Sequence, residues 1–198
     1  MQRIVVMGPP GAGKSTLARR LAEQLNAPVF HLDRLHWRPG WIEAPRDEFR
    51  AEVERIAALP RWVIDGNYSE TLEPRLRRAD TLVYLDTPSW LSILRIVRRT
   101  LRHHGQVRAD VAPGCPERFD LGFFWFVWTW NGIRRARAFA RIDAFGGRSV
   151  VVRRGDALSQ IMDALHALST DEDLPPRPQV RPAKSVETSA ASRSSNEA

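Results

Sequence analysis

A glycine-rich segment, G-P-P-G-A-G-K-S at residues 8–15, has the residue types and spacing of a phosphate-binding loop. It fits the pattern G-x-x-x-x-G-K-[ST], in which backbone N–H groups surround phosphates, the lysine reaches the β- and γ-phosphates and the hydroxyl binds Mg²⁺. A β-branched run, residues 3–7, precedes the segment, and residues 16–25 follow it with helix-forming composition and leucines four apart. Strand, glycine loop and helix are the context that this pattern requires. The sequence therefore predicts a site for ATP and Mg²⁺ made of Gly8, Pro9, Pro10, Gly11, Ala12, Gly13, Lys14, Ser15 and Thr16, in which Lys14 is also catalytic.

Three apolar, strand-like runs each end at an aspartate, and these aspartates are Asp33, Asp65 and Asp86. Because the carboxyl ends of parallel strands meet at one edge of a sheet, we expect the three carboxylates along one rim. Asp65 is expected to join Ser15 as a metal-binding residue, as the carboxylate that ends a strand does in P-loop enzymes. The alternative for Asp65 is a turn cap before Gly66.

The elements that must position these residues alternate between strand-like and helical runs, as in βαβ units with a parallel sheet. The expected strands are residues 3–7, 28–32, 61–64, 79–85 and 148–152, and the expected helices are 16–25, 46–58, 89–102, 119–142 and about 158–165. Residues 34–45 and 103–118 are expected to be loops. From residue 170 onward aromatic residues vanish and Pro, Ser, Ala and charge dominate. We therefore expect one domain at 1–168 and a disordered tail at 169–198.

The formal net charge of the 198 residues is +7, and the tail contributes almost nothing to it. The excess of arginine falls mainly at 95–118 and 134–141, which favours a polyanionic partner, either nucleotide phosphates or nucleic acid. A single cysteine, Cys115, excludes an internal disulfide. The most apolar run, 121–130, is too short to cross a bilayer, and no leader pattern opens the chain. We therefore expect a cytoplasmic protein that does not enter a membrane.

Several phrases of the sequence together resemble the adenylate-kinase-like P-loop proteins known as DNA topology modulation proteins. The phrases are G-P-P-G-A-G-K-S-T-L-A (8–18), H-L-D (31–33), W-R-P-G-W (37–41), W-V-I-D-G-N-Y (62–68), R-A-D-T-L-V-Y-L-D (78–86) and G-C-P-E-R (114–118). The resemblance implies a three-layer α/β fold of nucleotide-kinase type, with a parallel five-stranded sheet in the order 2-3-1-4-5. It also implies that residues 103–118 form a short lid over ATP.

The same resemblance suggests roles for further residues. Asp33 stands where related kinases bind or activate the acceptor hydroxyl, although a cap in a polar loop is an equal alternative. Arg95 and Arg99 match an R-x-x-x-R pair of adenylate kinases, and Arg135 and Arg137 look like the second arginine set of that family. All four are expected to be catalytic, because several arginines stabilise a transferring phosphoryl group. The alternative is that these arginines decorate solvated helix faces.

The sequence thus predicts a Mg²⁺-dependent kinase that transfers the γ-phosphoryl group of ATP to a nucleotide or another small acceptor. Asn67-Tyr68 follow Gly66 where adenylate kinases have Phe-Pro-Arg, which favours an acceptor other than AMP. A nucleotide-gated DNA-binding regulator and an ATPase without a small acceptor remain alternatives, although no nucleic-acid-binding motif is present. His31 is expected to pack inside the fold, and so is the aromatic run 123–130, with one face of the run toward the lid and a base-stacking platform as the alternative. Trp37 and Trp41 are candidates for stacking on an acceptor.

Overall fold

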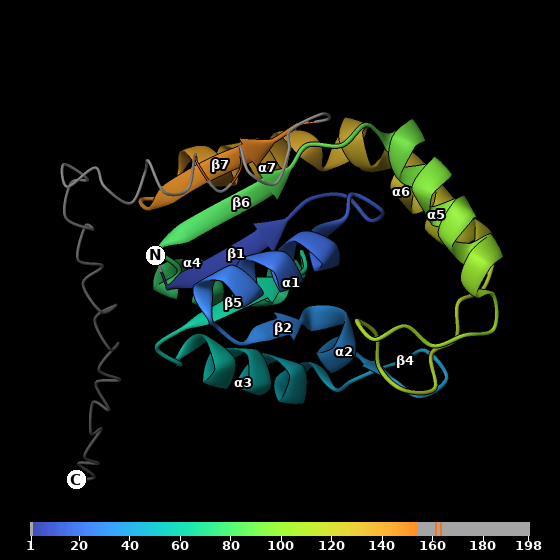
Figure 1. Ribbon diagram of the computed structural model, residues 1–198, viewed down its shortest axis with the longest axis horizontal. Coiled ribbons are helices and arrows are strands. Elements are labelled where there is room, and N and C mark those ends of the chain that lie inside the picture. The colour runs from blue at the N-terminus through green and yellow to red at the C-terminus, as the bar shows by residue number, and fades with distance from the viewer. Residues whose placement is uncertain (1, 154–160, 162, 164–198) are drawn as a thin grey trace, which may run out of the picture.

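A five-stranded parallel sheet forms the centre of the protein in a computed structural model that describes residues 2–153, 161 and 163 (Figure 1). Its strands are β1 (Arg3–Met7), β2 (Val29–His31), β5 (Trp62–Asp65), β6 (Thr81–Leu85) and β7 (Arg148–Val152). They are arranged in the order β2-β5-β1-β6-β7, and every neighbouring pair is parallel. This is the predicted order 2-3-1-4-5, so the predicted fold class is confirmed.

Helices cover both faces of the sheet, since alternate residues of each strand point to opposite sides. Ile4 and Val6 of β1 pack with Leu17 and Leu21 on one face, while Val5 packs into the core of the other face. The helices are α1 (Lys14–Leu25), α3 (Arg46–Ala57), α4 (Leu72–Arg78), α5 (Ser89–His103), α6 (Leu121–Ile133) and α7 (Arg135–Asp143). Buried residues of α1 belong to the first face, and those of α3, α4 and α7 belong to the second. The result is the predicted three-layer arrangement.

The segment expected as a loop at 34–45 is more ordered than the sequence indicated. The short helix α2 (Leu32–His36) follows β2 directly, and β3 (Trp37–Arg38) pairs antiparallel with β4 (Ile42–Glu43). Between β5 and β6 lie the 3-10 turn η1 (Ser69–Thr71) and α4, neither of which was predicted from the sequence.

The helix expected over 119–142 is in fact two helices, α6 and α7, which meet at Arg134. Gly132 lies in the last turn of α6, where glycine weakens a helix. Asp120 caps the start of α6 by accepting a 2.9 Å hydrogen bond from the Phe123 backbone N–H. The break lets Ala138 and Ile142 of α7 pack on the sheet.

The segment expected to form a lid, residues 103–118 and called the lid below, folds onto the β3–β4 hairpin. Val111, Ala112 and Cys115 form a small buried cluster against Trp37 and Trp41.

None of the helices in the described part of the chain is long and apolar enough to cross a membrane. The predicted closing helix at about 158–165 lies outside the described residues except for Ile161 and Asp163, which are helical, and the predicted tail at 169–198 lies outside them entirely.

Candidate active site

A cavity of about 850 Å³ opens over the carboxyl ends of β1, β2 and β5. The phosphate-binding loop and the start of α1 form one wall, and the lid with α5 and α6 forms another. The lining includes these predicted site residues: Pro10, Gly11, Gly13, Lys14, Ser15, Thr16, Asp33, Asp65, Arg95 and Arg99. Residues from distant parts of the sequence therefore meet where an open α/β sheet binds its ligands.

The phosphate-binding loop has a backbone that only glycine fits at two positions. Gly8 has φ 144° and a Cβ there would lie 2.6 Å from the Leu85 carbonyl oxygen, while Gly11 has φ 75° and a Cβ would lie 2.6 Å from the Ser92 carbonyl oxygen. Lys14 Nζ donates a 3.0 Å hydrogen bond to the Pro9 carbonyl, across the loop. Burial lowers the pKa of Lys14, and nearby carboxylates, Asp33 first among them, act in the opposite direction.

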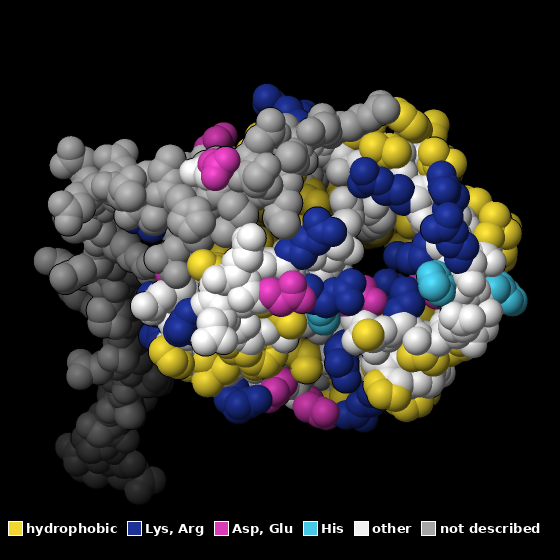
Figure 2. Space-filling view, in the orientation of Figure 1, with side chains coloured by type: hydrophobic (Ala, Val, Ile, Leu, Met, Phe, Trp, Pro, Cys, Tyr) yellow, Lys and Arg dark blue, Asp and Glu magenta, His cyan; other side chains and the backbone are white. Residues whose placement is uncertain are grey.

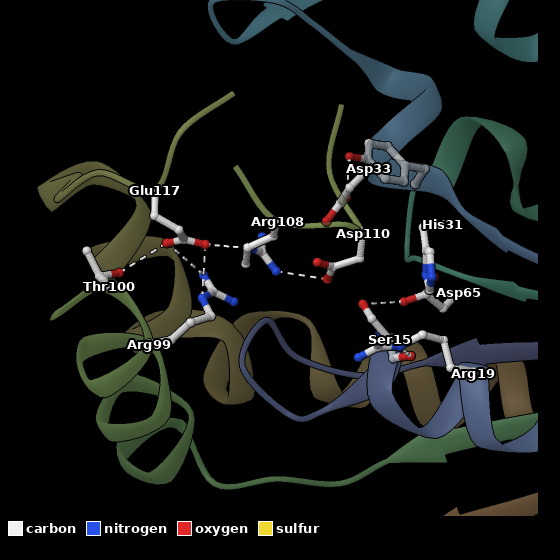
Figure 3. Close-up of polar contacts among 11 residues, drawn as sticks. Ser15, Arg19, His31, Asp33, Asp65, Arg99, Thr100, Arg108, Asp110 and Glu117 are labelled. Atoms are coloured by element: carbon white, nitrogen blue, oxygen red, sulfur yellow. Dashed lines mark hydrogen bonds and ion pairs between the residues drawn. The ribbon is translucent and has the colours of Figure 1, made fainter. Parts of the chain in front are cut away.

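A carboxylate from the neighbouring strand faces the loop. Ser15 Oγ donates a 2.8 Å hydrogen bond to Asp65 Oδ2, and the other carboxylate oxygen, Oδ1, lies 2.5 Å from His31 Nδ1 (Figure 3). The contact with His31 follows from the sheet, because His31 of β2 is the register partner of Asp65 of β5. His31 is buried in its strand, as expected, and it also fixes the orientation of Asp65.

A hydroxyl and a carboxylate are the hard oxygen ligands that Mg²⁺ prefers, so Ser15 and Asp65 fit the predicted metal. Within the residues that the structure describes, no group of three or more His, Cys, Asp or Glu side chains is arranged to hold a metal ion. Mg²⁺ in phosphoryl-transfer sites usually takes one or two protein ligands and completes its shell with phosphate and water oxygens. The pair therefore suits an ion that arrives with a nucleotide.

A second carboxylate, Asp33, lines the cavity from the first turn of α2. Tyr68 Oη donates a 2.7 Å hydrogen bond to Asp33 Oδ1. The Tyr68 ring lies against Phe49 and His36, with ring centroids 5.1 and 4.5 Å away. Burial first, and then the charge of Asp33, raise the pKa of the Tyr68 hydroxyl. The hydroxyl is therefore a permanent donor to the carboxylate.

The loop that carries Tyr68 is bonded to the phosphate-binding loop on one side and to a buried arginine beneath it. Asn67 exchanges two hydrogen bonds with the Gly8 backbone, from Asn67 Nδ2 to the carbonyl (2.9 Å) and from the Gly8 N–H to Asn67 Oδ1 (3.2 Å). Beneath the loop, the fully buried Arg75 guanidinium donates to four carbonyl groups, at 2.9–3.1 Å. The carbonyls are those of Gly66, Asn67, Tyr68 and Thr71. Burial lowers the pKa of Arg75 to about 9.

The lid is joined to α5 by a buried carboxylate, Glu117. It accepts a 3.2 Å hydrogen bond from Thr100 Oγ1, lies 3.0 Å from Arg99 Nε and forms an ion pair with Arg108 (Figure 3). Arg108 also pairs with Asp110 at 2.8 Å. Burial and the neighbouring Arg108 lower the pKa of Arg99, and Glu117 opposes them. This network places two guanidinium groups against the cavity.

Comparison with known proteins identifies the family. Residues 4–109 match the AAA domain family. Shikimate kinase from Chromohalobacter salexigens is 33% identical over 180 residues, which cover 81% of this chain and 95% of that protein. The chain belongs to the P-loop nucleotide-kinase family. Ribosome biogenesis protein BMS1 from Saccharomyces cerevisiae is 31% identical over 123 residues, or 50% of this chain, and the chain spans only 10% of that relative's length.

A solved structure shows that the fold is shared with other P-loop kinases. The shikimate kinase from Acinetobacter baumannii, solved in complex with shikimate, superposes with a TM-score of 0.52 at 20% identity. The match covers 86% of this chain and 92% of that one. At this level of identity the likeness concerns the fold.

Two of the four arginines expected to be catalytic lie at the cavity, and two do not. Arg95 and Arg99 line it, and Arg95 donates a 3.1 Å hydrogen bond to the Ala12 carbonyl of the phosphate-binding loop. Arg135 instead makes two hydrogen bonds to Asp86, at 2.8 and 2.7 Å, and the exposed Arg137 is not among the lining residues. The lining also contains three arginines that were not predicted as site residues from the sequence: Arg108, Arg118 and Arg134.

The aromatic run 123–130 is only partly buried, so the expected core packing holds for part of it, and one face lines the cavity together with residues of the lid. Phe123, Phe124, Phe126 and Trp130 line the cavity, whereas Trp125 and Trp128 are exposed. Trp37 and Trp41 also line it, and Trp41 Nε1 donates a 3.1 Å hydrogen bond to the Pro116 carbonyl of the lid. The two tryptophans therefore help to hold the lid.

Proposed function

We propose that this protein is a Mg²⁺-dependent kinase that transfers the γ-phosphoryl group of ATP to a hydroxyl or phosphate group of a small acceptor. The observation that carries this proposal is the shared cavity, which is lined by Lys14 and Ser15 and also by Asp33, whose charge acts on Lys14. A phosphate-binding loop alone would support any nucleotide-binding activity. A carboxylate aimed by a tyrosine into the same cavity supplies the second half of a transfer site.

At the donor end, the loop N–H groups and the N-terminus of α1 bind the phosphates, and Lys14 leaves its contact with Pro9 to reach them. Ser15 and Asp65 hold the metal and its water shell, while His31 keeps Asp65 in place. When bound, Mg²⁺ neutralises charge on the phosphate oxygens. The arginines that line the cavity, Arg95 and Arg99 of α5 and Arg108 and Arg118 of the lid, stabilise the charge that develops on the transferring group.

At the acceptor end, Asp33 acts as general base for a hydroxyl acceptor. The acceptor oxygen bonds to the γ-phosphorus, its proton passes to Asp33 Oδ2, and the bond to the bridging oxygen breaks to release ADP. Tyr68 occupies Oδ1, so Oδ2 is the oxygen that faces the acceptor. The lid packed on Trp37 and Trp41 excludes water that would otherwise take the phosphoryl group.

The acceptor end supports a molecule other than AMP. Asn67 binds Gly8 and Tyr68 binds Asp33. These two residues stand where adenylate kinases have Phe-Pro-Arg. The acceptor space is bordered by Trp37, Trp41 and Tyr68, whose rings favour a compact molecule with an apolar face. Shikimate kinases are among the relatives of this chain. Small hydroxyl compounds are therefore the first acceptors to test.

The test is a panel of nucleosides, nucleoside monophosphates and small hydroxyl compounds with γ-labelled ATP, followed by product analysis. We expect one class to be labelled by the wild type, and Lys14→Ala to lower kcat at least about 100-fold with the fold intact. Arg20→Ala is the matched control, because Arg20 is exposed on the same helix and does not line the cavity. Hydrolysis of ATP with no labelled acceptor, unchanged by Asp33→Ala, would show an ATPase instead.

A further inference from the structure

The exposed large hydrophobic side chains of this protein are concentrated in one region. Ten of the eleven in the described part of the chain fall between residues 90 and 133, which comprise α5, the lid and α6. Ile42, on β4, is the exception. Single exposed hydrophobic residues are normal on a protein surface, but a group of this size marks a surface that another molecule covers.

Helix α6 is apolar on both of its sides. One side lines the cavity with Phe124, Phe126 and Trp130. The other side exposes Leu121 (85%), Trp125 (69%) and Trp128 (57%), at the i, i+4, i+7 spacing of one helix face. A helix that is hydrophobic all round is normally buried, and here only its inner side has a partner among the described residues.

Helix α5 packs beside α6 and adds basic residues to the same surface. It exposes Leu94, Arg98, Leu101 and Arg102, which follow one another at helical spacing on the side opposite Ile96 and Thr100. We call Leu94, Arg98, Leu101, Arg102, Leu121, Trp125 and Trp128 the outer face. Figure 2 shows hydrophobic and basic side chains gathered at the end of the molecule where Figure 1 places these two helices.

The charge of the outer face has one sign. Neither α5 nor α6 contains an acidic residue. Residues 89–142 as a whole hold ten arginines and three carboxylates, and two of those carboxylates are already paired with Arg108. The surface that covers the outer face must therefore be apolar and negatively charged.

We propose that the outer face binds the surface of a bilayer that contains anionic lipid. Tryptophan and leucine are the residues that enter the interfacial layer, while arginine side chains contact phosphate headgroups. Helix α6 has 13 residues and is too short to cross a bilayer, so it lies in the plane of the surface. The cavity remains available, because its lining comes from the inner sides of both helices.

Two other occupants fit this face less well. Single-stranded nucleic acid would suit the arginines and tryptophans of the outer face. The most exposed large hydrophobic side chain of the face, however, is Leu121, and aliphatic side chains offer bases no stacking surface. A second copy of the chain would bring arginines against arginines, with no acidic residue on the face to pair them. Both are outcomes of the test.

The test is flotation of the full chain with vesicles of phosphatidylcholine alone or mixed with phosphatidylglycerol. We expect binding to the mixed vesicles that weakens at high salt, because the headgroup contacts are screened. Trp125→Glu/Trp128→Glu and Arg98→Glu/Arg102→Glu should each weaken it about tenfold or more. Ile42→Glu is the matched control, since Ile42 is equally exposed (64%) but lies on β4.

Far-UV circular dichroism and ATP turnover check that the variants remain folded. Both should match those of the wild type, because none of the substituted residues lines the cavity. The proposal is overturned if wild type does not bind mixed vesicles, or if both double variants bind as wild type does. It is also overturned if Trp125→Glu/Trp128→Glu dissociates a dimer in sedimentation, or if an oligonucleotide displaces the protein from the vesicles.

Discussion

Tyr68 donates a 2.7 Å hydrogen bond to one oxygen of Asp33, and the sequence separates the two residues by 35 positions. Tyr68 lies on the loop after β5, and that loop also binds Gly8 of the phosphate-binding loop through Asn67. A shift of this loop therefore displaces the acceptor carboxylate and the donor loop together. The short segment 66–68 couples the two halves of the cavity.

The first prediction concerns this bond. Tyr68→Phe should lower kcat/KM for the acceptor about tenfold and leave KM for ATP nearly unchanged, because a hydrogen bond to a charged group contributes more than about 1.4 kcal/mol. The measurement is initial rate with each substrate varied in turn. Asp33→Asn should remove acceptor phosphorylation while binding of an ATP analogue persists.

Tyr84→Phe serves as the control for Tyr68→Phe, since Tyr84 is a buried tyrosine on β6 that does not line the cavity. An equal effect of both variants on acceptor kinetics would show that the loss comes from general destabilisation. If Tyr68→Phe instead raised only the KM for ATP, Asp33 would act in binding ATP and not in binding the acceptor.

The fold was predictable where the sequence pattern is local. The glycine loop, the strand end at Asp65 and the order of the strands follow from runs of neighbouring residues and from the family resemblance, whereas Asp33, expected directly after a strand, lies in the first turn of α2. The roles of the buried Arg75 and Glu117 could not be predicted from the sequence, because the groups that they bind come together only in the folded chain. Sequence spacing also gives no side-chain direction, and Arg135 turns to Asp86 although Arg134 lines the cavity.

The second prediction concerns the metal. Asp65→Ala should raise the Mg²⁺ concentration needed for half-maximal turnover about tenfold or more, because only the Ser15 hydroxyl remains from the pair. The affinity of the protein–ATP-analogue complex for Mn²⁺, followed by electron paramagnetic resonance, should fall in parallel. Asp47→Ala, an exposed change in the first turn of α3, is the control. Unchanged Mn²⁺ affinity would contradict metal binding by Asp65 and favour the alternative, a turn cap before Gly66.

The third prediction concerns the brace beneath the acceptor loop. Arg75→Met should lower the free energy of unfolding by about 3 kcal/mol, because it leaves four backbone carbonyls without their donor. Urea denaturation measures the change. Arg77→Met, on the exposed side of the same helix, should alter it by less than about 0.5 kcal/mol. Equal effects of the two variants would contradict a special role for the buried guanidinium.

The fourth prediction separates a structural from a catalytic role for Arg135. Its two hydrogen bonds lower the pKa of Asp86 below the ordinary 3.8. A carboxyl with a lowered pKa in the folded state adds stability above its unfolded pKa and loses it as pH falls through the folded value. Because Arg135 is 44% exposed, the pair contributes only about 1 kcal/mol.

Asp86→Asn and Arg135→Gln should therefore each lower the free energy of unfolding by about 1 kcal/mol at neutral pH. The difference between wild type and Asp86→Asn should shrink as the pH falls below about 4, because Asp86 is protonated first in the unfolded state and then, at lower pH, in the folded state as well. Denaturant titrations at several pH values measure this, with Arg137→Gln as the exposed control on the same helix. Arg135→Gln should keep kcat within about twofold, because Asp86 already binds the guanidinium. A large loss of kcat at unchanged stability would instead mean that Arg135 leaves Asp86 for the transferring phosphate.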